Sequence, residues 1–232
     1  MPVELRGKKV CINFAQNIEI CAIMVLKTRD RLIEVARQLF ARKGIENTTM
    51  NDIASASDKG RRTVYTYFRN KRDIFNAVVE QETETLLRKL TEIENKDISP
   101  TLKLEQYIVC RFETMREIVS RNGSLKAGFF RDVRKVDRAR KLVSSHEIEI
   151  LSRIIKQGQQ AGQFGECNAE HTATVVVHCI HGLDIPYIRD NLADQGLDQT
   201  AVMRVVTEMI LNGLRRRLPC ELPVDESSVS GV

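Results

Sequence analysis

The sequence predicts an all-α protein with a three-helix domain near its N-terminal end and a larger helical bundle after it. Two observations predict this fold class. From residue 28 onward, apolar residues recur every three or four positions, the period of a helix with one buried face. No segment alternates apolar and polar residues as a half-buried strand does. The chain has 232 residues, of which 42% are apolar, so it can form a sizeable core.

The first 23 residues follow a different pattern. They lack a helical period, and Met24 opens a run that leads directly into the first regular helix. We therefore expect residues 1–23 to be a disordered extension and Met24 to be the native start. The expected domains are 24–72 for the three-helix domain and 73–218 for the bundle, with a flexible tail at 219–232.

The first two helices are bounded by cap residues. The first is predicted over 28–43, with Gly44 as its C-cap, from an apolar stripe of Leu32, Val35, Ala36, Leu39 and Phe40. Thr48 and Thr49 then offer an N-cap for a helix of about two turns. Asp52 falls in its first turn, where a carboxylate suits the helix dipole.

A third short helix follows the turn Ser57–Gly60 and is predicted over 61–68. Val64 and Phe68 are four residues apart, so they share the face that packs inward. Two short helices joined by about four residues, after a longer supporting helix, are the helix-turn-helix arrangement. Five side chains are then expected on the outward side of the third helix: Arg61, Arg62, Thr63, Tyr65 and Thr66.

The charge of this region favours a polyanionic partner. Residues 28–72 carry eleven Lys or Arg against five Asp or Glu, whereas the whole chain has a net charge of only +5. A short helix with donors at its N-terminal end fits the DNA major groove, where two adjacent arginines suggest a half-site containing guanine. Tyr67 and Lys71 would hold phosphates. A solvated basic face is the plain alternative.

Three segments of this region form a recognisable pattern: 48–54 (TTMNDIA), 63–68 (TVYTYF) and 70–75 (NKRDIF). On these segments, residues 28–80 resemble the DNA-binding domain of the tetracycline-repressor (TetR) family of bacterial regulators. The resemblance implies that Thr49 caps the second helix next to a phosphate, that Thr63 and Tyr65 face the groove, and that Tyr67 and Lys71 bind phosphate. It also implies an all-helical ligand-binding and dimerisation domain in the rest of the chain.

The turn departs from the family pattern. Asp58, Lys59 and Gly60 stand where the family usually has Gly, a β-branched apolar residue and Ser. We therefore expect a turn without its apolar plug, and a third helix with Gly60 as a weak N-cap.

The bundle is read from further helical patterns over 71–93, 102–120, 125–135, 137–158, 169–183 and 199–218. The last two are candidates for a homodimer interface, because two-fold symmetry lets two reading helices reach successive grooves. Side chains that could line a ligand pocket, or simply pack in the core, are Phe112, Met115, Phe129, Phe130, His178, His181 and Tyr187.

Other classes of protein are disfavoured. The six cysteines are scattered without paired spacing, and no long uninterrupted apolar run is present, which favours a reducing cytoplasm and no membrane span. His178 and His181, with Cys179 between them, could belong to a metal or haem sensor, but hydrogen-bonded histidines buried at an interface are the simpler interpretation. No catalytic motif is found. We therefore expect no enzyme activity, no cofactor and no metal.

Together these features predict a homodimeric repressor that binds a palindromic DNA operator and is released by a small-molecule effector. Two alternatives stay open. One is a helical metal or small-molecule sensor, or an enzyme, whose basic face is incidental. The other is a dimeric adaptor without sequence-specific DNA binding.

Overall fold

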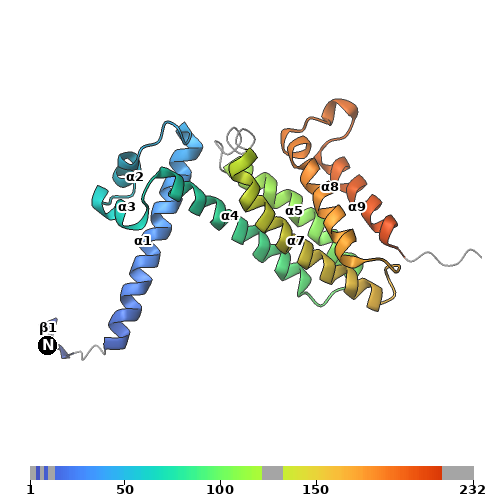
Figure 1. Cartoon of the computed structure of the whole chain (residues 1–232), viewed down its shortest axis with the longest axis horizontal. Coiled ribbons are helices and arrows are strands. Elements are labelled where there is room, and N and C mark those ends of the chain that lie inside the picture. Colours follow the sequence, from blue (N-terminus) through green and yellow to red (C-terminus); the bar gives the residue numbers. More distant parts are fainter. Residues whose placement is uncertain (1–3, 6–7, 10–13, 122–132, 216–232) are drawn as a thin grey trace, which may run out of the picture. The chain divides into compact units, whose positions relative to one another are not determined.

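The computed structural model describes residues 4–5, 8–9, 14–121 and 133–215, and these are almost entirely helical (Figure 1). A short antiparallel pair, β1 and β2, precedes the helices. In chain order the elements are β1 (Glu4–Leu5), β2 (Lys8–Lys9), α1 (Phe14–Lys43), α2 (Met50–Ala56), α3 (Arg61–Tyr67), α4 (Lys71–Glu94), α5 (Pro100–Arg121), α7 (Val133–Gln160), α8 (Ala169–Arg189), the 3-10 turn η1 (Ala193–Gln195) and α9 (Gln199–Leu214). The all-α prediction is confirmed.

The chain divides into two compact units. The first contains residues 1–82 and 119–136, and the second contains 83–118 and 137–232. The division falls inside α4, whereas the sequence analysis placed it at the start of that helix. A continuous helix carries no mark in its sequence where its packing partners change.

The core of the first unit joins α1 to the two short helices. The apolar stripe of α1 packs on α2 and α3 and on the first turns of α4. Leu32, Ile53, Val64 and Ile74 are each fully buried. At about 25 cal/mol per Å² of apolar surface, such burial is the main term that holds these short helices, which are too short to be stable alone.

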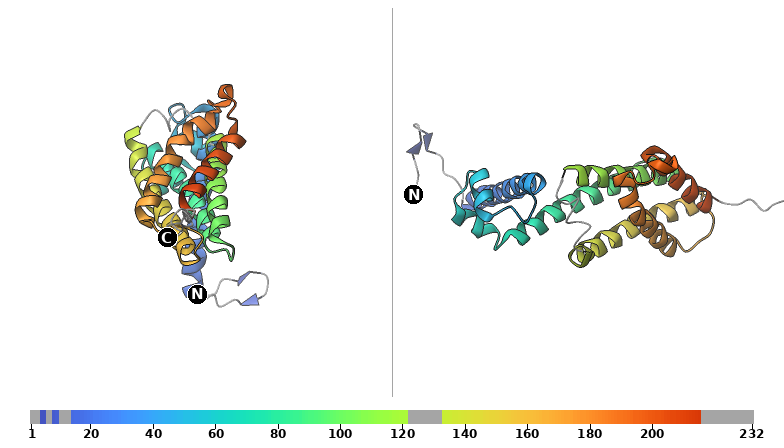
Figure 2. Two further views of the ribbon diagram at one scale, coloured as in Figure 1. Left: turned by 90° about the vertical axis from the view of Figure 1, so that its right-hand side faces the viewer. Right: turned by 90° about the horizontal axis from the view of Figure 1, so that it is seen from above.

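The second unit is a bundle in which α5, α7 and α8 lie alongside one another, with α9 next to α8 (Figures 1 and 2). Its largest fully buried side chains come from α4, α5, α7 and α8 and include Leu90, Tyr107, Phe112, Ile154 and Tyr187. Phe164, in the loop after α7, is 2% exposed and lies against α7. No helix among the described residues is both long and apolar enough to cross a membrane.

Three expectations about the elements are wrong. α1 begins at Phe14 rather than at residue 28, so residues 14–23 are helical; no Gly or Pro interrupts them, and a helix needs no apolar period to continue. β1 and β2 were not expected, because two-residue strands are too short to show alternation. α8 continues past Leu183 to Arg189 despite Pro186 within it, and ends where Asp190 takes a left-handed φ of +54°.

Other boundaries agree with the predictions within a few residues. α5 begins at Pro100, a residue that suits the first position of a helix. α9 ends at Leu214. Residues 125–132 of the predicted helix 125–135 and the predicted tail at 219–232 lie outside the described residues.

Candidate nucleic-acid interface

Polar contacts among neighbouring residues fix the loop between α1 and α2 and the N-terminus of α2. Gly44 ends α1 with φ of +84°, which favours glycine. The Thr49 hydroxyl oxygen accepts from the Asp52 N–H at 3.1 Å, and the Asp52 carboxylate accepts from the Thr49 N–H at 2.8 Å. This is a capping box, which confirms the predicted N-cap. Hydrogen bonds from Lys43, at 2.7 Å, and from the Thr49 N–H lower the pKa of Asp52 to about 2.

The turn between α2 and α3 has the weaknesses that the sequence predicts. Asp58 takes a left-handed φ of +54°, a conformation that suits glycine better than residues with a Cβ. Lys59 is exposed, so it supplies no apolar plug. Gly60 begins α3 without a side-chain cap. Below the turn, the Ser57 hydroxyl is buried and donates to the Ala54 carbonyl at 3.1 Å, which ties the turn to α2.

One side of α3 is anchored and the other is open. Val64 is fully buried and Phe68 is 5% exposed, so both hold the helix inward as predicted. The remaining residues of α3 differ in exposure. Thr63 and Tyr67 are half-buried, between the buried and the open side of the helix, and the exposed residues are Arg61, Arg62, Tyr65 and Thr66. The structure therefore gathers four of the predicted reading residues on one solvent-facing surface, and places Thr63 at its margin.

Two contacts fix side chains on this surface. The Arg61 guanidinium carbon lies 5.5 Å from the centre of the Tyr65 ring, a cation–π arrangement across one helical turn. The Thr66 hydroxyl donates to the carbonyl of Arg62 at 3.0 Å, so its methyl group remains for an apolar contact.

The other predicted DNA-binding residues have different surroundings. Thr48 is 1% exposed and its hydroxyl donates to the Gly44 carbonyl at 2.7 Å. Its side chain therefore closes the loop before α2 and does not lie on the exposed surface of α3, so the geometry gives no support to the predicted DNA contact of Thr48. The Lys71 ammonium donates to the Glu46 carbonyl at 3.1 Å and is half-buried. Lys71 thus stabilises the loop before α2 through this hydrogen bond, and it also places a positive charge just after the end of α3.

The sequence analysis did not assign Arg29 to this site. Its guanidinium lies 5.7 Å from the centre of the Phe68 ring, which brings a cation of α1 to the end of α3. The sequence showed Arg29 only as one of several polar positions on α1. The contact depends on how α1 packs against the short helices, which periodicity does not reveal.

The pocket candidates do not form one cavity. Phe112 and Tyr187 are buried with ring centres 4.8 Å apart, and Met115 is 8% exposed, so these three are core residues. Phe129 and Phe130 lie outside the described residues. An open groove of about 520 Å³ runs instead between α4 and α5. It is lined by Lys89, Ile93, Leu102, Val109, Cys110 and Glu113, among others.

The two histidines have separate partners. His178 is exposed on α8 of the single chain, and its Nδ1 donates to the Thr174 carbonyl at 2.7 Å. The Nε2 of His181 lies 2.6 Å from a carboxylate oxygen of Glu147. Among the described residues, no three His, Cys, Asp or Glu side chains are placed to hold a metal ion.

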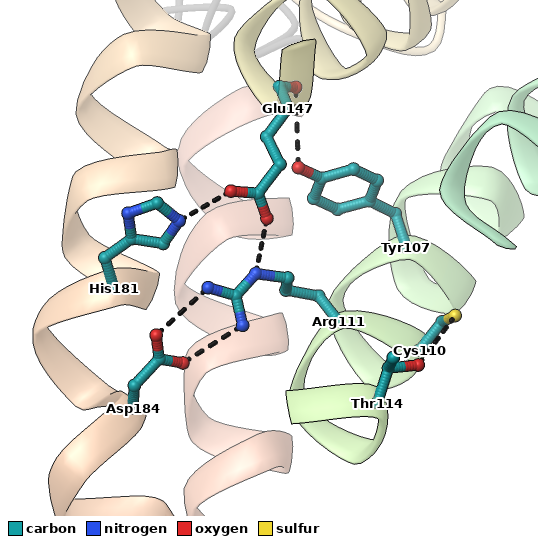
Figure 3. Close-up of polar contacts among 7 residues, drawn as sticks. All are labelled: Tyr107, Cys110, Arg111, Thr114, Glu147, His181 and Asp184. Carbon is teal, nitrogen blue, oxygen red and sulfur yellow. Dashed lines mark hydrogen bonds and ion pairs between the residues drawn. The ribbon is translucent and has the colours of Figure 1, made fainter. Parts of the chain in front are cut away.

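His181 belongs to a buried ionic cluster that joins α5, α7 and α8 (Figure 3). Arg111 contacts Glu147 through its Nε, and makes two hydrogen bonds of 3.0 Å to Asp184. Burial opposes the charge of Glu147, but Arg111 and His181 outweigh it and hold the Glu147 pKa below its ordinary value. The cluster fixes the spacing of three helices, and periodicity did not predict it.

Comparisons with known proteins agree with the geometry of the three-helix domain. Residues 32–78 match the family described as bacterial regulatory proteins, tetR family. Over 57 residues the chain is 46% identical to the Probable acrEF/envCD operon repressor of Escherichia coli strain K12. That match covers 25% of this chain and only 26% of that protein.

Solved structures extend the likeness to most of the chain. A transcriptional regulator from Cytophaga hutchinsonii is 27% identical with a TM-score of 0.67, over 80% of this chain and 97% of that one. A structure from Saccharomonospora viridis in complex with choline is 19% identical with a TM-score of 0.63, over 82% of this chain and 99% of that one. This second likeness is one of fold alone.

Proposed function

We propose that this chain, a helix-turn-helix transcriptional regulator of the tetR family, is a homodimeric repressor that binds a palindromic operator and is released by a small-molecule effector. The observation that carries the proposal is the open surface of α3. Arg61, Arg62, Tyr65 and Thr66 are exposed on a helix whose other side is anchored in the core. Such a surface can enter a major groove and contact base edges.

Phosphate contacts would come from the margins of this surface. Tyr67 and Lys71 follow the exposed part of α3, and Thr49 caps α2. These groups set the position of α3 on the duplex without reading its sequence. The basic excess of residues 28–72 supplies the salt-dependent part of the affinity.

Exposed apolar side chains on the last two helices support a homodimer. Val175 on α8 is 62% exposed, and Met209 on α9 is 69% exposed. Val205 lies one turn before Met209 and is also exposed. A second copy packed against these side chains would cover them, and two-fold symmetry is what lets two recognition helices reach successive grooves about 34 Å apart.

The effector is proposed to bind the second unit. A protein of the same fold is known in complex with choline, which supports a small-molecule ligand here as well. The groove between α4 and α5 offers a place where a ligand would contact α4 directly. Since α4 runs from the end of the reading domain into the second unit, a ligand with different affinities for two arrangements of α4 would shift DNA binding.

The test is to select bound sequences from a random double-stranded DNA pool at near-physiological salt. The expected result is one enriched two-fold symmetric site, bound by a dimer. Tyr67→Phe should weaken binding about equally on all sequences, because it removes only a phosphate contact. A folded dimer that enriches no sequence at any salt would instead indicate an adaptor without sequence-specific DNA binding.

A further inference from the structure

The two arginines at the start of α3 are unfavourable for the helix itself. Arg61 and Arg62 occupy its first two positions, where the helix dipole is positive. The first turn contains no acidic residue, and Gly60 gives no side-chain cap. Within the part of the chain that the structure describes, neither arginine forms an ion pair with a carboxylate. Local choices that oppose stability are typical of functional positions.

The surroundings of the two arginines differ. The Arg61 guanidinium lies over the Tyr65 ring, with 5.5 Å between its central carbon and the ring centre. Tyr65 is four residues later on the same side of α3 and is 43% exposed, so the pair lies on the open surface. No ring in the described residues lies against Arg62 in this way. The Tyr65 ring therefore restrains the Arg61 side chain, and within the described residues no ring restrains Arg62 in the same way.

A cation–π contact on Tyr65 is compatible with base recognition by Arg61. A cation–π contact uses the flat face of the guanidinium, while its N–H groups point outward in the plane. Two parallel N–H groups match the O6 and N7 acceptors of guanine. Because a stacked side chain has already lost part of its rotamer freedom, it loses less entropy when it binds.

We propose that Tyr65 is a positioning residue that orients Arg61 to read one guanine in each half-site, while Arg62 binds phosphate. This inference rests on the proposed DNA-binding function. It assigns different roles, base recognition and phosphate binding, to two adjacent and chemically identical side chains. Loss of the ring should therefore have the same effect on sequence preference as loss of Arg61. Loss of Arg62 should have a different one.

The experiment measures the affinity of four variants for the selected operator and for each of its single-base-pair changes, across a range of salt. The variants are Arg61→Ala, Arg62→Ala, Tyr65→Leu and Tyr65→Phe. Arg61→Ala should lose roughly five- to hundred-fold discrimination at one guanine per half-site. Tyr65→Leu should lose discrimination at that same position, and Tyr65→Phe should keep it because the ring remains.

Arg62→Ala should weaken binding uniformly and reduce the salt slope by about one for each subunit. The double variant Arg61→Ala/Tyr65→Leu should discriminate no worse at that guanine than Arg61→Ala, since the ring acts through the arginine. Circular dichroism of each variant controls for folding, and exposed positions are expected to leave it unchanged.

Three results would overturn the inference while leaving the proposed function intact. Arg61→Ala could weaken all sequences equally, Tyr65→Leu could keep full discrimination, or Tyr65→Phe could lose as much as Tyr65→Leu. The last would mean that the hydroxyl of Tyr65, and not its ring, makes the contact. A wild-type protein that prefers no sequence would instead count against the proposed function itself.

Discussion

Gly158 gives the sharpest prediction about stability, because the space that a methyl group would need at this position is already filled. A Cβ built on Gly158 lies 2.0 Å from Cδ2, 2.3 Å from Cε2 and 2.7 Å from Cγ of Phe164. All three distances are far below van der Waals contact. The φ of Gly158 is not in the left-handed region, so an alanine would meet no backbone strain there. The expected effect of Gly158→Ala is therefore purely steric.

The magnitude follows from what Phe164 must do. Its ring is 2% exposed, and its N–H donates to the Gly158 carbonyl at 3.1 Å, so the ring cannot simply swing into solvent. A shift within the core costs about 1–3 kcal/mol, and complete expulsion of the ring costs about 3–5 kcal/mol. For a chain of this size, 2 kcal/mol corresponds to a decrease of roughly 4–8 °C in the melting temperature.

Urea and thermal unfolding at one protein concentration measure the effect. Gly182→Ala is the matched control: Gly182 is helical with nothing within 4 Å of a built Cβ, so alanine should stabilise by about 0.5–1 kcal/mol. The double variant Gly158→Ala/Phe164→Ala should be no less stable than Phe164→Ala alone, since the ring that clashes has gone. If Gly158→Ala were as stable as the wild type, the steric reasoning would be refuted.

Three further predictions concern charge and backbone. Arg111→Leu should cost about 3–5 kcal/mol in urea unfolding, because it removes the cationic partner of the buried Asp184 and leaves the buried Glu147 with His181 alone. The exposed Arg116→Leu should change stability by less than about 0.5 kcal/mol. The Glu147 pKa is lowered in the folded protein, so its contribution to stability is present above about pH 4.5 and is lost as the pH falls through the folded-state value. Unfolding measured over an acid pH series should show this loss, and Glu147→Gln should flatten it. Asp58→Gly should stabilise by about 0.5–1 kcal/mol, because glycine adopts the observed φ of +54° without strain, and a loss of stability would show that the Asp58 side chain makes a necessary contact.

Much of the exposed surface of α3 and of the helix caps around it was predictable from sequence, because these features depend on residues close together in the chain. The inward positions of Val64 and Phe68 follow from their spacing of four, and the Thr49 cap follows from the residue types around it. The missing cap at Gly60 was likewise evident from residue type. The burial of Thr48 was not predictable, since two adjacent threonines look alike until the loop closes on one of them.

In the helical bundle, by contrast, the sequence predicted the helices but not the contacts between them. Periodicity identified α5, α7 and α8 as helices, although it ended α8 six residues early and divided α7 at residue 136, and it said nothing of their shared ionic cluster. Arg111 reads as an ordinary polar position on an amphipathic helix, and His181 reads as a candidate ligand-binding side chain. Their partners are distant in sequence, so only the packing of three helices brings these charges together.

By itself, then, the sequence determined the class of fold, most of the helices, and the residues of α3 that face outward. Those features depend on hydrogen bonds and side-chain spacings within a few residues, which a helical period records. The tertiary structure alone decided that Thr48 closes a loop, that Arg29 reaches Phe68, and that Arg111 lies in a buried cluster. Each of these contacts depends on how segments distant in sequence pack against one another. The free energy of that packing is distributed over many side chains, so no local sequence pattern predicts the contacts.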